Sequence, residues 1–223
     1  MVGTMRSAYW TARRTLGLTP MRRTLAELER RGVVVKDLVT LEAFGGTGDN
    51  HILDYAARVA SLEIWEIDPA CEPILRRKAP TAKILITDSI AQLHRTQSRY
   101  DFIIFDNPMA DYNDHKYCEH FDLFPGVFEV AADEAVLALS VVTRPTPLSR
   151  RRAPHLFNEV HLRRRREFYG TSTPDDVGFD EMARTYHRLA EAAGFHVDWW
   201  FGLERSIAHF IVMKIRRSCA AVE

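Results

Sequence analysis

The first group of residues suited to binding a cofactor lies in segment 39–50 of this 223-residue chain. An apolar run ends there in the carboxylate of Glu42, and Gly45, Gly46 and Gly48 follow it. Because glycine has no Cβ, the backbone of such a turn can pass close to a ligand. The helical pattern that begins after the turn adds free N–H donors and a partial positive charge. Strand, tight turn and helix start, in this order, are how an open α/β fold binds a nucleotide-like cofactor.

Strand and helix patterns alternate around this segment. Apolar runs predict strands at 38–41, 62–67, 82–87, 100–105 and 135–142, and apolar residues at helical spacing between them predict helices. Such alternation indicates a mostly parallel sheet covered on both faces. Two last runs, 195–201 and 207–215, predict an antiparallel hairpin. We therefore expect an α/β fold with a mostly parallel, seven-stranded sheet and a C-terminal antiparallel hairpin.

The domain organisation follows from helix signals and composition. Residues 1–32 are expected to form an N-terminal helical segment, because Thr19-Pro20 is a typical helix start and Gly32 a typical helix stop. Residues 33–223 are expected to form one domain. Within it, segment 143–179 is rich in arginine, proline and serine, and we interpret it as an irregular insertion or a lid.

Two shorter segments carry further expectations. The pattern near 119–131 predicts a single helix leading into the strand at 135–142. Trp199 and Trp200 lie in a predicted strand, and at least one of them is expected in the core rather than at a ligand site.

The motif that begins at Glu42 resembles the first motif of the class I S-adenosylmethionine-dependent methyltransferases. That motif is an acidic residue followed by alternating glycines, and here Phe44 replaces the first glycine of the commonest form. The variant is similar to motif I of many nucleic-acid base methyltransferases. The resemblance covers roughly residues 34–215 and includes an antiparallel edge of the sheet. It implies a Rossmann-like three-layer sandwich, S-adenosyl-L-methionine as cofactor, and binding through Phe44, Gly45, Gly46 and Gly48.

Carboxylates at later strand ends suit the other groups of this cofactor. Glu66 closes the strand at 62–67 about twenty residues after the glycines, where a carboxylate can accept both ribose hydroxyls. Asp68 is the alternative for that role. Asp88 would lie near the adenine amine, with Ser89 beginning the next helix, although Asp88 also fits a helix N-cap. Glu42 would organise the glycine turn or meet the methionine ammonium.

The acceptor side is expected after the strand at 100–105, because ligands of open α/β sheets bind at the carboxyl ends of strands. Asp106 and Asn107 follow that strand. Amino-directed base methyltransferases have a D/N/S-P-P-aromatic motif at this place. This chain departs from that motif, because it has Asn107 in place of the first proline and Met109 in place of the aromatic residue. The resemblance implies an acceptor-site role for Asp106 and Asn107, and Asp106 also borders the cofactor.

The polar loop that follows offers general bases. Asp111 and His115 are the candidates, and the alternative interpretation is an exposed loop with helix-cap chemistry. We expect no metal site.

Arginines 150–152 and 163–166 form a basic stretch with His155 and Phe157 between them. Arginine suits phosphate by bidentate geometry, and aromatic rings can stack on bases. The stretch therefore predicts contact with RNA or DNA. Glu159 and Glu167 interrupt it, which leaves a solvated helix face as the other interpretation.

Composition limits the remaining choices. Lys+Arg and Asp+Glu number 30 each, so no global charge attracts nucleic acid or a membrane. No apolar run approaches the roughly 20 residues that a bilayer requires, and the first residues do not resemble a secretory signal. The three cysteines, Cys71, Cys118 and Cys219, have no disulfide or metal spacing, so we expect reduced thiols and a cytoplasmic protein.

The expected activity is methyl transfer from S-adenosylmethionine. The acceptor is left open between a nucleic-acid base and a small molecule. Two alternatives remain: an aminopropyltransferase similar to spermidine synthase, and a non-catalytic binding or assembly subunit that keeps the fold. A homodimer is also left open.

Overall fold

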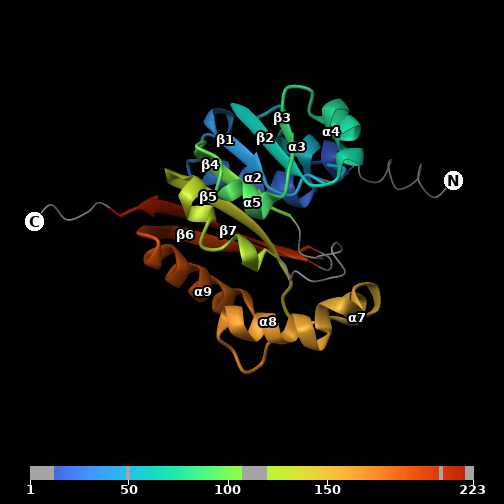
Figure 1. Ribbon diagram of the computed structural model, residues 1–223, viewed down its shortest axis with the longest axis vertical. Helices are drawn as coiled ribbons and strands as arrows, with labels where there is room; N and C mark the ends of the chain where they lie inside the picture. Colours follow the sequence, from blue (N-terminus) through green and yellow to red (C-terminus); the bar gives the residue numbers. More distant parts are fainter. Residues whose placement is uncertain (1–12, 49–50, 107–119, 206–207, 219–223) are drawn as a thin grey trace, which may run out of the picture. The chain divides into compact units, whose positions relative to one another are not determined.

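The computed structural model describes residues 13–48, 51–106, 120–205 and 208–218. Its strands form a seven-stranded mixed sheet in the order β3-β2-β1-β4-β5-β7-β6, flanked by helices (Figure 1). This confirms the predicted α/β fold class, with a mostly parallel sheet and antiparallel strands at the C-terminal end. The chain divides into two compact units, residues 1–89 (unit 1) and residues 90–223 (unit 2).

Unit 1 contains three parallel strands with short connections. Its elements are α2 (Pro20–Arg30), η1 (Val35–Asp37), β1 (Val39–Glu42), α3 (Ile52–Tyr55), β2 (Ser61–Glu66), η2 (Pro69–Cys71), α4 (Glu72–Lys78) and β3 (Lys83–Ile86). Strand β2 pairs with β1 on one side, where Glu42 lies opposite Ile64, and with β3 on the other. Ile64 and Trp65 are fully buried, as expected of a strand with partners on both sides.

The N-terminal part of unit 1 is attached through the buried carboxylate of Asp54. Helix α2 begins as its sequence predicts, since the side chain of Thr19 caps it and Pro20 follows. The Thr19 hydroxyl also donates to the fully buried Asp54 carboxylate of α3 at 2.7 Å, and Arg14 donates to it at 2.9 Å. Helix α3 is thereby fixed from the side of the N-terminal segment.

Unit 2 contains the other four strands. Its elements are α5 (Ser89–Leu93, beginning at the last residue of unit 1), β4 (Tyr100–Phe105), η4 (Phe121–Leu123), α6 (Val127–Val130), β5 (Ala131–Val141), α7 (Pro147–Arg152), η5 (Pro154–Phe157), α8 (Glu159–Tyr169), α9 (Phe179–Ala192), β6 (Phe195–Leu203) and β7 (His209–Arg217). Strands β4 and β5 are parallel, whereas β7 runs antiparallel to both β5 and β6. The predicted terminal hairpin is therefore present.

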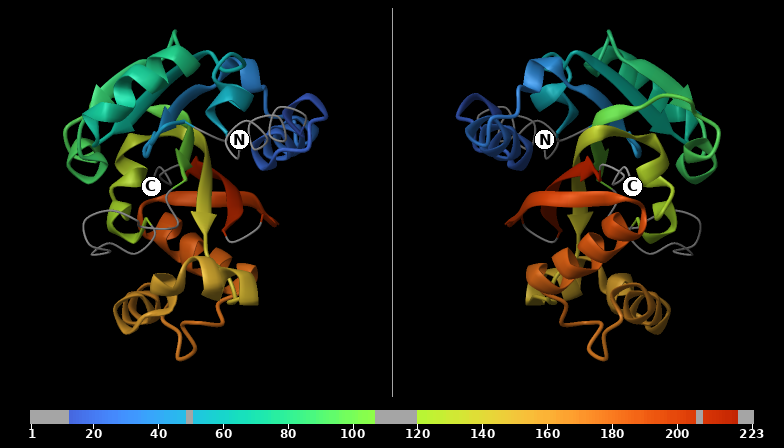
Figure 2. Two further views of the ribbon diagram at one scale, coloured as in Figure 1. Left: turned by 90° about the vertical axis from the view of Figure 1, so that its right-hand side faces the viewer. Right: turned by 90° about the vertical axis from the view of Figure 1, so that its left-hand side faces the viewer.

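Helix α9 covers the hairpin, and α8 packs against α9 (Figure 2). The buried face of α9 includes Met182, Tyr186 and Ala190. Trp199 and Trp200 are only half-buried, so the expectation that one of them lies in the core is wrong. Among the aromatic residues of strand β6, Phe195 is the one that is buried.

Two local expectations differ from the structure. The single helix expected near 119–131 is replaced by η4 and α6, because Pro125 and Gly126 interrupt it. Segment 143–179 is largely helical and not irregular. Thr146 begins α7 with a capping box, Asn158 caps α8, and Gly170 ends α8 in the left-handed conformation.

In the part of the chain that the structure describes, no helix is long and apolar enough to cross a membrane.

Candidate functional site

The glycine loop, residues 43–48, connects β1 toward α3 in unit 1. Its glycines serve two different purposes. A Cβ at Gly45 would lie 2.5 Å from a methyl carbon of Ile64, and one at Gly48 would lie 2.8 Å from Ile52. Those two glycines allow close packing against the buried side chains behind the loop. Gly46 has φ +50° and open space where a Cβ would point, so its backbone faces outward.

Glu66 orients the outer side of this loop. Its Oε2 accepts the backbone N–H of Gly46 at 2.5 Å, and its Oε1 accepts the N–H of Asp68 at 2.7 Å. Each oxygen keeps a further lone pair. The carboxylate is thus held in one orientation beside the open glycine, and the remaining lone pairs suit a pair of hydroxyl donors. The buried strand β2 supplies the rigid support.

Glu42 lies fully buried at the end of β1. Its Oε2 accepts the Tyr55 hydroxyl at 2.6 Å and contacts Nε2 of His51 at 2.9 Å. His51 immediately precedes α3 and Tyr55 is its last residue, so the carboxylate joins the end of β1 to this short helix. Of the two roles expected for Glu42, organising the turn is the one that these contacts support.

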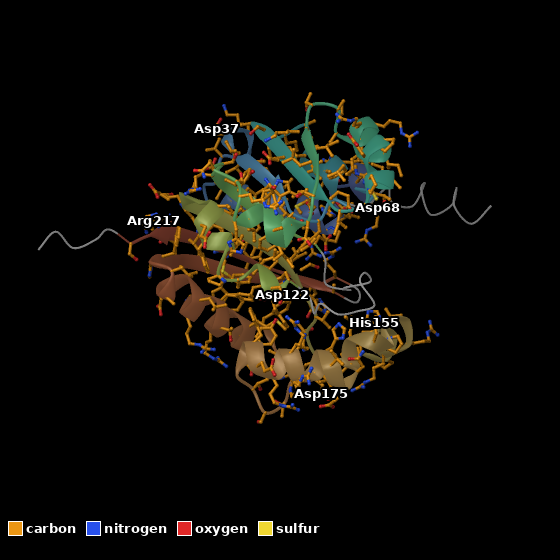
Figure 3. All side chains as sticks on the ribbon, viewed as in Figure 1. Asp37, Asp68, Asp122, His155, Asp175 and Arg217 are labelled. Atoms are coloured by element: carbon orange, nitrogen blue, oxygen red, sulfur yellow. The ribbon has the colours of Figure 1, made fainter. Side chains whose placement is uncertain are left out.

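The other acidic candidates of unit 1 occupy different surroundings. Asp68 is exposed, and its Oδ1 accepts the N–H of Ala70 at 2.9 Å, which makes it the cap of η2; Figure 3 labels it after the end of β2. Asp88 is exposed after β3. The hydroxyl of buried Ser89 donates to the backbone oxygen of Ala43 at the start of the glycine loop. Ser89 therefore supports the loop from behind.

Three contacts of the loop region were absent from the sequence-based site. Two of them are the contacts of His51 and Tyr55 with Glu42. In the third, the Lys78 ammonium donates to the backbone oxygen of Thr47 at 2.6 Å. Lys78 belongs to the last turn of α4, 31 positions along the chain from Thr47. No spacing rule connects a helix end with a loop so far away, so the sequence carried no signal for this contact.

Asp106 follows β4 in unit 2 and is held by an arginine that sequence reasoning missed. Arg205 donates to Oδ1 at 2.9 Å and to Oδ2 at 3.4 Å. The same guanidinium donates to the hydroxyl of Ser140 on β5 at 3.3 Å. Of the four catalytic candidates, only Asp106 is described, because Asn107, Asp111 and His115 lie outside the described residues.

A buried polar side chain, His120, begins the next described part of the chain after Asp106. His120 is 2% exposed, and its Nε2 is 2.8 Å from the hydroxyl of Tyr186. Its ring also stacks on Phe105 and Tyr186. Burial lowers the pKa of His120 to about 3, while a hydrogen bond with the backbone of Ser140 opposes this shift. The imidazole is therefore neutral at ordinary pH and connects η4 to α9.

The arginines of α8 are not equivalent. Arg165 is 2% exposed and donates to the backbone oxygen of Pro174 at 2.7 Å. Arg164 binds both oxygens of Asp122, at 2.6 and 2.7 Å, a residue labelled in Figure 3. Arg163 and Arg166 are exposed. Half of this predicted basic stretch is therefore used inside unit 2.

The first arginine stretch has a similar mixture. Arg150 lies 3.9 Å from Asp175 and 5.2 Å from the ring centroid of Phe157, and Arg151 is exposed. Within the described residues, no group of three or more His, Cys, Asp and Glu side chains could hold a metal ion.

Comparison with known proteins identifies the fold. No family model and no curated protein matches the chain. Solved structures do, among them PH1948 from Pyrococcus horikoshii, a proposed RNA methyltransferase, with a TM-score of 0.55 and 14% identity over 89% of this chain and 83% of that one.

Two further structures contain the cofactor. Magnesium protoporphyrin IX methyltransferase (ChlM) from Synechocystis with bound SAM has a TM-score of 0.53 and 13% identity over 89% of this chain and 78% of that one. TYW2 from M. jannaschii in complex with AdoMet has a TM-score of 0.51 and 10% identity over 86% and 75%. The chain thus has the fold of class I S-adenosylmethionine-dependent methyltransferases.

Proposed function

We propose that this protein is an S-adenosylmethionine-dependent methyltransferase. The observation that carries the proposal is the Glu66 carboxylate, which two backbone N–H groups orient beside the open face of Gly46. A diol binds a carboxylate presented in this way through the lone pairs that the backbone leaves available. The class I methyltransferase fold, and the cofactor named for ChlM and TYW2, support the same proposal.

The proposal assigns roles to six residues of unit 1. Glu66 would accept the ribose hydroxyls, and the backbone of Gly46 would lie along the cofactor. Asp88, exposed after β3, would meet the adenine amine. Glu42, Ser89 and Lys78 would hold the loop in shape without touching the ligand. The bound cofactor would supply an electrophilic methyl group, and the chain's part is to position donor and acceptor.

On the acceptor side, the proposal assigns Asp106, and with it Asn107, Asp111 and His115. The first acceptor class to test is a base of RNA. The printed descriptions of PH1948 and of a tRNA m1G37 methyltransferase from M. jannaschii, which has a TM-score of 0.51, favour this choice. So do the exposed side chains of Arg163 and Arg166, which suit phosphate. A small-molecule acceptor is the alternative.

Two measurements test the proposal in sequence. Calorimetric titration with S-adenosylhomocysteine should show one site per chain. Isotope transfer from methyl-labelled S-adenosylmethionine should then be screened over total RNA, DNA and a metabolite extract. Label in RNA supports the base acceptor, and label only in the metabolites supports a small molecule. If the cofactor does not bind, the proposed function is wrong. Binding without transfer to any of the three pools would favour a non-catalytic subunit.

A further inference from the structure

Three residues of unit 2 contact the guanidinium of Arg205. Its guanidinium binds both oxygens of Asp106 and the hydroxyl of Ser140, which is fully buried. The same guanidinium lies 4.4 Å from the centroid of the Phe210 ring. The side chain of Arg205 is 20% exposed and that of Asp106 is 9% exposed. An arginine with so many contacts has little rotational freedom.

The backbone of Arg205 is also fixed. Its N–H donates to Nδ1 of His209, the first residue of β7, at 3.1 Å. This bond requires a ring nitrogen without a proton. Burial lowers the pKa of His209, and the nearby positive charge of Arg205 lowers it further, against an opposing effect of Glu204. The neutral ring at ordinary pH thus holds the backbone of Arg205 beside the first residue of β7.

These contacts converge on the end of the strands where an open α/β sheet binds its ligands. Asp106 comes directly after β4, and Ser140 is the penultimate residue of β5. His209, at the start of the antiparallel strand β7, pairs with Val141 at the end of β5. Arg205 therefore reaches Asp106 at the carboxyl ends of two parallel strands.

We propose that Arg205 is a positioning residue for methyl transfer, which holds Asp106 in the orientation that receives the acceptor. This inference rests on the proposed function. A carboxylate that accepts from one guanidinium through both oxygens is held in one orientation. Asp106 is then suited to accept a hydrogen bond from the acceptor, and the proposal assigns removal of a proton to another group.

A purely stabilising ion pair is the competing explanation, and the same hairpin offers a matched control. Arg216 on β7 binds Asp198 on β6 at 2.5 Å, near the other end of the two strands. That pair joins the hairpin and involves no strand-end acid of the parallel part of the sheet. Removing either arginine tests the loss of one charge and one ion pair in the same structural element.

The experiment compares Arg205→Met, Arg205→Lys and Arg216→Met with the wild type. We expect Arg205→Met to lower kcat of methyl transfer at least about tenfold, because small displacements of a reacting group have effects of this size. Affinity for S-adenosylhomocysteine should change by less than about twofold, because the proposal assigns the cofactor mainly to the glycine loop and Glu66 of unit 1, whereas Asp106 only borders it. Arg205→Lys should recover part of kcat, because it keeps the charge but loses the bidentate geometry. Arg216→Met should leave kcat unchanged.

Each outcome has a clear meaning. If the wild type transfers methyl groups and Arg205→Met does so equally well, the positioning role is wrong and the methyltransferase assignment stands. Equal losses in Arg205→Met and Arg216→Met, without rescue by lysine, would show a stabilising role and also overturn the inference. Thermal unfolding of each variant identifies any variant that is not folded, in which case Arg205→Lys decides. If the wild type binds no cofactor or transfers no label, the proposed function fails and this inference fails with it.

Discussion

The backbone N–H of Gly46 donates to Oε2 of Glu66, 20 positions away in the sequence, at 2.5 Å. The glycine loop and the end of β2 therefore share one carboxylate, which both orders the loop and faces its open side. This contact makes the two halves of the candidate cofactor site dependent on each other.

Gly46→Arg should abolish binding of S-adenosylhomocysteine in a folded protein. The substituted side chain would extend into the open space beside the loop, and the φ of +50° adds only local strain. Gly32→Arg is the matched control, because Gly32 also has a positive φ and open surroundings but lies after α2. Calorimetry measures both variants. Retained affinity in folded Gly46→Arg would contradict the assignment of the loop.

Gly45→Ala separates packing from binding at the same loop. Its Cβ would lie 2.5 Å from a methyl carbon of the fully buried Ile64, so we expect overpacking that costs about 1–3 kcal/mol of stability. Urea unfolding monitored by fluorescence measures this change. Equal stability of Gly45→Ala and the wild type would show that Ile64 moves aside at no cost.

Glu66→Ala should weaken cofactor binding more than Asp68→Ala does. Loss of charge-assisted hydrogen bonds to the ribose costs roughly 1.5–3 kcal/mol, which is about tenfold to hundredfold in affinity. Asp68 caps η2 through Ala70, so its replacement should reduce stability by about 1 kcal/mol and leave most of the affinity. If calorimetry finds that Asp68→Ala binds the cofactor more weakly than Glu66→Ala does, the carboxylate that binds the ribose is Asp68.

Stability should fall in acid partly because of His120. The pKa of this buried imidazole is about 3 in the folded protein against 6.5 in an unfolded chain. Between these values the unfolded state binds more protons, so the free energy of unfolding decreases as the pH falls. At about pH 5, this residue alone accounts for a loss of about 2 kcal/mol relative to neutral pH.

His120→Gln should remove this contribution, since an amide can still bond to Tyr186 but does not titrate. Urea unfolding at about pH 7.5 and about pH 5 should show a smaller difference for this variant than for the wild type. His196→Gln, at an exposed position of β6, serves as the control. Parallel behaviour of His120→Gln and the wild type would contradict a buried neutral imidazole.

Changing Arg163 and Arg166 together to glutamine should reduce the salt dependence of RNA binding. Both side chains are exposed, and each phosphate contact on a single strand contributes about 0.7 to the slope of log K against log salt. The slope should therefore decrease by up to about 1.4. A control variant with Arg77→Gln and Arg95→Gln loses two exposed charges elsewhere and should change the salt slope less. Wild type that binds no RNA at low salt would favour a small-molecule acceptor.

Local sequence patterns were sufficient to predict much of the fold of this protein. Glycine spacing, strand-to-helix alternation and apolar runs predicted the α/β sheet, its terminal hairpin and the acids at the strand ends. Such signals act over a few residues, and so they can be read from the chain directly. The helices of segment 143–179 had readable caps at Thr146 and Asn158, which the arginine-rich composition obscured.

The sequence alone therefore determined which residues stand at the strand ends, because that depends on local periodicity. Only the tertiary structure decided what each of them contacts. Tyr55 binds Glu42 across the turn, Arg164 turns inward to Asp122, and Arg205 reaches Asp106 from 99 positions away. Pairs so distant along the chain are brought together by the packing of whole elements, and no short-range rule specifies which arginine meets which acid.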